Sequence, residues 1–264
     1  GTLAAAWSGL PIVCHASDAL PDRANRLLAP WGSRITVNYS AAARYFPAAK
    51  TVVTGQPIRR EFFETTREQA RSSLGIPPEA FVLLVVGGSQ GARTLNHGTT
   101  GALSRLLSDE STYVVHLTGA AEHEDTLARA REQIGDSPRY IAQAFSEDPW
   151  VTTSVADLCL TRGGASGLAE TAAKGVPMIV VPYPHAAGHQ RLNIPVLVDA
   201  GAAIPVEDAE LTPDRLAHTV AELRGDRGRL GEMSRNALGA TNPRAAEDIA
   251  QILAQLAVQG GATG

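Results

Sequence analysis

The chain has 264 residues, of which 44% are hydrophobic and 19% charged, and its formal net charge is −4. This apolar content supports a sizeable core and excludes wholesale disorder. The sequence has no block of Lys and Arg, which argues against binding DNA or RNA through bulk electrostatics.

Two cysteines, Cys14 and Cys159, lie far apart and exclude both a disulfide scaffold and a zinc site built from cysteines. One long stretch without Asp, Glu, Lys or Arg, residues 175–190, contains three prolines. It is shorter than the ~20 apolar residues that a membrane-spanning helix needs, so we predict no transmembrane segment.

The first part of the chain contains three short apolar runs, which predict strands over residues 10–15, 34–39 and 50–55. Residues 56–78 are polar and include Pro57, a charged cluster and a pair of prolines, which predicts a connection between two units with a helix near 67–74. About 60 residues with three strands are too few for an independent Rossmann domain, and the chain starts with Gly1. We therefore expect the beginning of the first domain to be missing.

A second series of strands alternates with helix-period segments. Strands are expected at 81–88, 112–119, 139–145, 157–161, 177–183 and 202–206, and helices at 92–107, 121–134, 165–174, 216–223 and 244–257. Residues 81–86 are continuously apolar, which is typical of a parallel strand covered on both faces. The alternation predicts a doubly wound parallel sheet. The predicted division is 1–64, 65–240, and a C-terminal helix with a flexible tail over 241–264.

The first glycine-rich motif is Gly87-Gly88-Ser89-Gln90-Gly91, between a predicted buried strand and a helix. Free amides at a helix start favour a bound anion such as a diphosphate. The same residues fit the nucleophile elbow of α/β-hydrolases, with Asp157 or Glu170 and then His185 following in the required order. A tight strand-to-helix turn without a ligand is a third interpretation. This motif alone does not decide among them.

A second glycine-rich motif, Arg162-Gly163-Gly164-Ala165-Ser166-Gly167, also follows a predicted strand and opens a helix. Two helix starts at the carboxyl ends of parallel strands suit a diphosphate, whereas a hydrolase needs one elbow. Glu170 lies in the first turns of this helix, where a carboxylate can accept both hydroxyls of a ribose. The alternative is a surface glutamate favoured by the helix dipole.

Polar side chains also follow the predicted strand 177–183. Gln190 and Asn193 are three residues apart and share one face of a helix, which suits the hydroxyls of a sugar. His185 and His189 lack the acidic partners of a metal site, so we predict loop hydrogen bonds and no metal. Arg59, at the boundary of the two units, suits a diphosphate or is simply solvated. His15, at the end of a strand, is a candidate base or a histidine at the edge of the core.

Together these motifs resemble the GT-B enzymes of glycosyltransferase family 28 that transfer N-acetylglucosamine to an undecaprenyl-linked acceptor in peptidoglycan synthesis. The similar stretches are VVGGSQGARTLN (85–96), ASGLAETAAKGVPMIVVPYPHAAGHQRLN (165–193), ANRLLA (24–29), AARYFP (42–47) and VVTGQPIRRE (52–61). The resemblance implies two Rossmann-like domains, the first incomplete, and a general base in a segment that is not in this sequence.

The resemblance also implies a role for each matching residue. Ser89 contacts the phosphates of UDP, the backbone of residues 165–168 (Ala165, Ser166, Gly167 and Leu168) approaches the diphosphate, and Arg59 lies near it. Glu170 binds the ribose, a backbone group near Ser146 reads the uracil, and Gln190 with Asn193 binds N-acetylglucosamine. The implied donor is UDP-N-acetylglucosamine without a further cofactor, and the implied partner is a lipid-linked acceptor at the cytoplasmic face of the plasma membrane. Trp7 and residues 27–31 are candidates for contact with that membrane, or pack ordinarily.

Two positions depart from the family pattern. Where the family has His-Glu-Gln-Asn on the acceptor side, this chain has His15-Ala16-Ser17-Asp18, and Gln56 stands for the Asn of a Gly-Asn-Pro-Val-Arg segment. The resemblance is therefore stronger on the donor side than on the acceptor side. A related transferase with another acceptor, a hydrolase that uses Ser89, and a non-catalytic protein that binds nucleotide sugars stay as alternatives.

Overall fold

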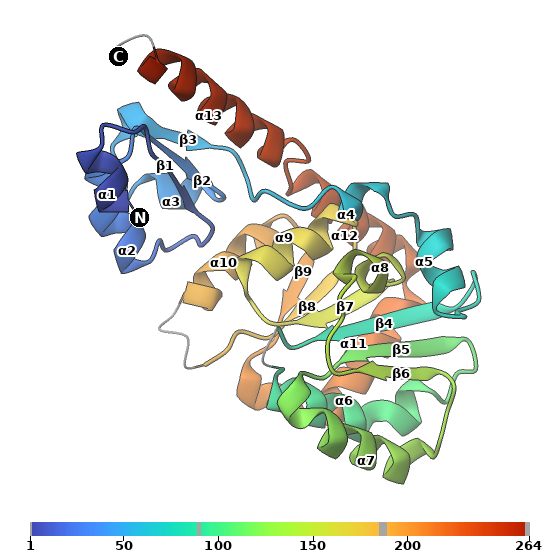
Figure 1. The fold of residues 1–264 in the computed structure, drawn as a ribbon. Coiled ribbons are helices and arrows are strands. Elements are labelled where there is room, and N and C mark those ends of the chain that lie inside the picture. The colour runs from blue at the N-terminus through green and yellow to red at the C-terminus, as the bar shows by residue number, and fades with distance from the viewer. Residues whose placement is uncertain (1, 89–90, 185–188, 262–264) are drawn as a thin grey trace.

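A computed structural model describes residues 2–88, 91–184 and 189–261, whose strands form two separate parallel sheets (Figure 1). The first sheet has the order β1-β2-β3, with β1 (Val13–Ala16), β2 (Arg34–Val37) and β3 (Thr51–Val53). The second has the order β6-β5-β4-β7-β8-β9, with β4 (Phe81–Val86), β5 (Thr112–Leu117), β6 (Tyr140–Gln143), β7 (Leu158–Thr161), β8 (Met178–Val180) and β9 (Ala203–Pro205). Each predicted strand is confirmed, and so is the α/β class with parallel sheets.

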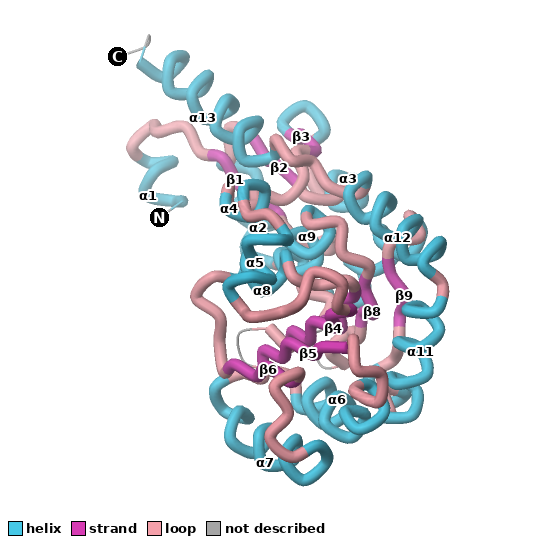
Figure 2. Tube along the Cα trace, turned by 90° about the vertical axis from the view of Figure 1, so that its right-hand side faces the viewer, coloured by secondary structure: helices cyan, strands magenta, loops and turns pink. Residues whose placement is uncertain are grey.

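Helices cover both faces of the second sheet (Figures 1 and 2). Alternate residues of β4 explain this arrangement, because Leu83 and Val85 pack with α6 and α11 while Val82 and Leu84 pack with α9 and α10. All four side chains are fully buried. The helices of this unit are α6 (Arg93–Leu106), α7 (His123–Ile134), α8 (Pro149–Ser154), α9 (Ala165–Ala173), α10 (His189–Asp199), α11 (Pro213–Gly225) and α12 (Arg227–Gly239).

The neighbouring strands β4, β7 and β8 of the second sheet have their carboxyl ends in register. Val86 at the end of β4 pairs with Thr161 of β7, which in turn pairs with Val180 of β8. The loops that follow these three strands therefore start side by side, at the carboxyl end of the sheet. Since the chain runs outward in both directions from β4 and β7, their boundary is the topological switch point, where open α/β sheets bind ligands.

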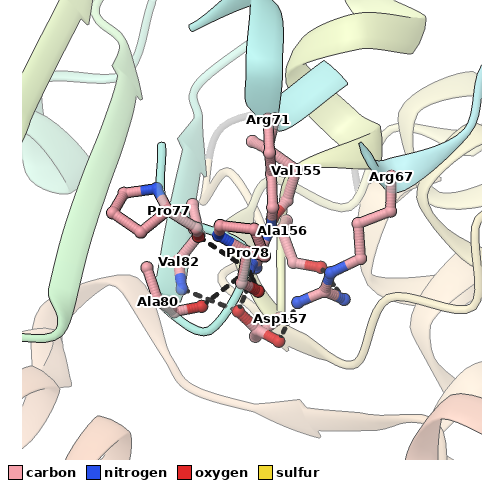
Figure 3. A network of polar contacts seen from close by, with 9 residues as sticks. All are labelled: Arg67, Arg71, Pro77, Pro78, Ala80, Val82, Val155, Ala156 and Asp157. Carbon is pink, nitrogen blue, oxygen red and sulfur yellow. Dashed lines mark hydrogen bonds and ion pairs between the residues drawn. The ribbon is translucent and has the colours of Figure 1, made fainter. Parts of the chain in front are cut away.

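The connection between the two units packs against the amino end of this sheet, where strands β4 and β7 begin. This connection contains α4 (Glu61–Glu64) and α5 (Arg67–Ser73). Arg71, which is 2% exposed, donates to Asp157 Oδ2 at 2.8 Å and to Ala80 O at 2.9 Å, and Arg67 forms a second ion pair with Asp157 (Figure 3). Asp157 Oδ2 also accepts from Val82 N at 2.7 Å. These contacts attach α5 to the amino end of the sheet.

This position of Asp157 corrects one sequence-based alternative. Asp157 lies before β7 and contacts the start of β4, whereas Ser89 follows the end of β4. Strands rise about 3.3 Å per residue, so the first and last residues of the six-residue β4 are about 17 Å apart. Asp157 therefore cannot serve as the acidic partner of a nucleophile at position 89.

The C-terminal segment returns to the first unit. Helix α13 (Ala245–Gly261) extends past the first unit (Figure 1), and just before it Asn242 Nδ2 donates to Thr54 O at 2.8 Å. The helix continues four residues beyond the predicted end at 257, and residues 262–264 of the predicted flexible tail lie outside the described part of the chain. The other helices of the first unit are α1 (Thr2–Trp7), α2 (Arg23–Leu28) and α3 (Ser40–Ala43).

Candidate functional site

The two glycine-rich loops lie side by side, because they follow the neighbouring strands β4 and β7. In the first loop, Gly88 and Gly91 have φ angles of +85° and +76°, which favour glycine. Gly91 N donates to Gly88 O at 2.9 Å, so the loop closes tightly before α6 begins. Ser89, predicted to contact phosphate, lies outside the described residues, as does His185.

The second loop ends at Gly164, whose extended backbone (φ −72°, ψ 129°) caps α9. Leu168 N donates to Gly164 O at 3.0 Å, so the amides of Ala165, Ser166 and Gly167 are those without an intrahelical acceptor. The prediction for Leu168 is corrected, because its amide is used by the helix and its side chain is fully buried in the core. Three amides, and not four, are available to an anion.

Asp208 connects the start of α6 with the loop that follows β7. It lies in a short 3-10 turn (Asp208–Glu210) and forms an ion pair with Arg162, while its Oδ2 accepts from Thr94 Oγ1 at 3.0 Å. Arg162 also donates to Val181 O at 3.2 Å. The start of α6 and the loops after β7 and β8 are thereby held in one arrangement. Sequence reasoning missed Asp208, because no motif marks it and the contact spans 46 residues.

Glu170 lies half-buried on α9, close enough to Arg59 for their charges to interact. Burial raises the pKa of the Glu170 carboxyl, and the positive charge of Arg59 acts in the opposite direction. The Arg59 guanidinium carbon lies 4.9 Å from the centroid of the Trp150 ring, at cation–π distance. The structure therefore brings Arg59 and Glu170 together and adds Trp150 of α8, which sequence reasoning missed.

Ser146 is half-buried in the segment between β6 and α8. Helix α8 packs against α9 and α4, so this segment joins the group of elements that carry Glu170 and Arg59. The predicted role of a backbone group here stays a prediction.

The predicted sugar-binding pair needs a correction. Asn193 is completely buried: its Oδ1 accepts from Ala19 N at 2.8 Å, and its Nδ2 donates to Asp18 Oδ1 at 2.8 Å and to Gly163 O at 3.0 Å. Its amide therefore joins the two units and has no donor left for a sugar in this conformation. Gln190 Oε1 accepts from Tyr183 N at 3.0 Å, which leaves the Gln190 amide group as the available donor.

The predicted acceptor-side residues also lie on the contact between the units. Asp18 accepts from Asn193, as described above. His15 Nδ1 is 2.9 Å from Thr36 Oγ1, and its Nε2 is 3.3 Å from Gln56 Oε1. Burial lowers the pKa of His15, and the hydrogen bond with Gln56 raises it by a smaller amount. The imidazole is therefore neutral near pH 7.

A cavity of about 320 Å³ lies between the two units, with Tyr39, Thr54 and Gln56 on one side and Leu168 and Val196 on the other. Away from it, His97, Glu122 and Asp125 place their ligand atoms within 4.8 Å of one another. Arg93 is 3.8 Å from Glu122 and Arg129 is 2.8 Å from Asp125, so both carboxylates already have cationic partners. We assign no metal to this group.

The two-sheet fold, with its two glycine-rich loops at the switch point of the second sheet, defines an α/β protein of the GT-B class. A structure of MurG from Acinetobacter baumannii has a TM-score of 0.74 with 29% identity, covering 97% of this chain and 70% of that one. A UDP-GlcNAc 2-epimerase from Neisseria meningitidis has a TM-score of 0.70 at 16% identity, with 96% and 72% covered, which shows the fold alone.

The sequence model of the glycosyltransferase family 28 C-terminal domain matches residues 82–251. The UDP-N-acetylglucosamine--N-acetylmuramyl-(pentapeptide) pyrophosphoryl-undecaprenol N-acetylglucosamine transferase of Desulforudis audaxviator is 39% identical over 98% of this chain and 70% of its own length. The counterpart from Halothermothrix orenii is 38% identical over 89% of the chain and 65% of its own length. The chain therefore belongs to glycosyltransferase family 28.

Proposed function

We propose that the chain binds UDP-N-acetylglucosamine and transfers its sugar, with inversion, to N-acetylmuramyl-(pentapeptide) pyrophosphoryl-undecaprenol. The observation that carries this proposal is the pair of glycine-rich loops at the β4–β7 switch point, with three amides of α9 available to an anion. The names of the relatives supply the sugar and the acceptor.

The departing UDP gains negative charge as the bond to the sugar breaks. Amides at the start of α9 and the charge of Arg59 are suited to stabilise this charge in place, because they are oriented before the reaction begins. Glu170 accepts the ribose hydroxyls, and the Gln190 amide donates to the sugar. In this mechanism the acceptor hydroxyl attacks the anomeric carbon, UDP leaves, and no metal ion is required. We name no general base.

Titration calorimetry with UDP tests the donor half of the proposal. We expect one UDP site with a dissociation constant in the micromolar range, unchanged by EDTA, and competition by UDP-N-acetylglucosamine. Transfer of labelled sugar to the lipid-linked acceptor tests the other half. Absence of UDP binding with and without Mg²⁺ would refute the proposal, whereas transfer only to a different lipid-linked acceptor would correct the acceptor and keep the donor.

No helix among residues 2–88, 91–184 and 189–261 is both long and apolar enough to cross a bilayer. We propose that the first unit contacts the cytoplasmic face of the plasma membrane through Trp7, Leu10, Leu27 and Trp31, which are 96%, 59%, 69% and 48% exposed. Helices α1 and α2 both contact the turn that contains Trp31, so these side chains belong to one region. Large exposed apolar groups beside a lipid-linked substrate favour a peripheral membrane contact.

Sedimentation with vesicles of phosphatidylglycerol and phosphatidylethanolamine tests this contact. The double variant Trp7→Ser, Leu27→Ser is expected to lose most of the vesicle-bound fraction, because two large apolar side chains no longer enter the interface. Leu238→Ser, on the distant helix α12 and also exposed (51%), is the matched control and should bind like wild type. Equal sedimentation of all three proteins would contradict the proposal.

A further inference from the structure

Gln56 connects the two units through both ends of its amide. Its Oε1 is 3.3 Å from His15 Nε2 in the first unit, and its Nε2 donates to Ser166 Oγ at 3.3 Å in the second. His15 lies near the end of β1, and Ser166 is in the first turn of α9, beside the amides that are available to an anion. One side chain therefore spans from the end of the first sheet to the diphosphate end of the candidate site.

Thr36, His15, Gln56 and Ser166 form a chain of hydrogen bonds in which each residue donates to the next. Thr36 Oγ1 is 2.9 Å from His15 Nδ1 and 3.5 Å from Cys14 O, so its hydrogen is better placed on the imidazole. Because His15 is neutral, it carries one N–H, which is then on Nε2 and donates to Gln56 Oε1. The Gln56 amide nitrogen, which can only donate, directs its hydrogen at Ser166 Oγ.

Ser166 accepts this hydrogen bond, and its own hydroxyl hydrogen is left to donate elsewhere. The Ser166 side chain is exposed at the start of α9, where the amides of Ala165 and Gly167 also face an incoming anion. A hydroxyl oxygen that accepts from an amide becomes a better donor through the same hydrogen-bond chain. The hydroxyl therefore adds a fourth donor to the three amides.

We propose that Gln56 is a positioning residue that orients the Ser166 hydroxyl toward the diphosphate of the bound nucleotide and couples this orientation to contact between the two units. This inference rests on the proposed function. Side-chain length is essential to it: an asparagine, one methylene shorter, cannot reach both His15 and Ser166 from the same backbone position. The chain carries Gln56 where the family pattern has asparagine, so the contact is a feature of this protein's own sequence.

A double-mutant cycle on the 264-residue chain tests the coupling, with the UDP dissociation constant as the readout. Gln56→Ala and Ser166→Ala are each expected to weaken UDP binding about three- to tenfold, as expected for loss of one hydrogen bond. The double variant should bind UDP no more weakly than Ser166→Ala, because Gln56 acts through Ser166. Gln56→Asn should behave like Gln56→Ala, and Gln133→Ala, exposed on α7, should bind like wild type.

Nitrogen-15 NMR of His15 supplies a second readout that requires no ligand. The wild-type imidazole should carry its proton on Nε2, and both Gln56 variants should shift the population toward the Nδ1–H form, since the acceptor on Nε2 is removed. Additive losses in the cycle, or an Nδ1–H imidazole in the wild type, would overturn the inference while UDP binding still supports the proposed function. Failure of the wild type to bind UDP would instead refute the proposed function, and the role assigned to the Ser166 hydroxyl with it.

Discussion

Replacement of Glu170 by Gln is expected to weaken UDP binding about 10- to 100-fold. The carboxylate is proposed to accept both ribose hydroxyls, and hydrogen bonds to a charged group are worth about 1.5–3 kcal/mol. The glutamine offers one oxygen and turns an amide group toward the other hydroxyl. Titration calorimetry with UDP measures the effect, and Glu124→Gln, an exposed glutamate on α7, is the matched control. Equal affinities for Glu170→Gln and wild type would exclude Glu170 from the site.

The same pair of proteins gives a pH-dependent test. Burial raises the pKa of Glu170 above its usual 4.5, so its carboxyl becomes protonated at a higher pH than an exposed glutamate would. The protonated form loses the charged acceptor, and UDP affinity of the wild type should therefore fall as the pH is lowered through this raised pKa. UDP also takes up protons over this pH range, and it does so equally with both proteins. The difference in binding free energy between wild type and Glu170→Gln therefore cancels this contribution and reports on Glu170. A difference that stays constant with pH would contradict the assigned role.

Gly91→Ala is expected to destabilise the second unit by about 3 kcal/mol or more, which lowers Tm by about 10 °C. Two effects combine at this position. The backbone has a φ of +76°, which strains any residue with a Cβ, and the added Cβ would overlap the Thr118 carbonyl oxygen and lie 3.0 Å from Gly119 Cα. Both neighbours are backbone atoms, so they cannot move aside as a flexible side chain would. Thermal unfolding followed by circular dichroism measures the change.

Gly88→Ala is the matched control for this substitution. Gly88 lies in the same loop with a φ of +85°, but a Cβ there would meet no atom of the described residues within 4 Å, its own chain neighbours aside. It should cost only the backbone strain of about 1 kcal/mol. A Tm of Gly91→Ala equal to that of Gly88→Ala would show that the loop relaxes and that close approach to Thr118 is unimportant.

Local sequence patterns determined the nine strands of the described residues, their parallel arrangement and the two glycine-rich helix starts. They did so because apolar periodicity and glycine at turns act over a few residues, and because alternating strands and helices permit few topologies. They missed α12, whose sequence contains Gly228, Gly231 and Gly239 and has little helical propensity. This helix is stabilised instead by the burial of Met233 and Ala237 against the second sheet.

Only the tertiary structure decided which polar side chains are available to a ligand. Asn193 and Gln190 look equivalent on a helix face, yet the approach of the first unit buries Asn193 against Asp18 and Ala19. No local motif marks Asp208, and none places Gln56 against its partner in the other unit; the contacts span 46 residues for Asp208 and 110 for Gln56. Such contacts depend on how two separately patterned units meet, and no periodicity along the chain encodes that geometry. The sequence thus predicts candidate residues for a nucleotide-sugar site, whereas the packing of one unit on the other shows which of them already have partners within the protein.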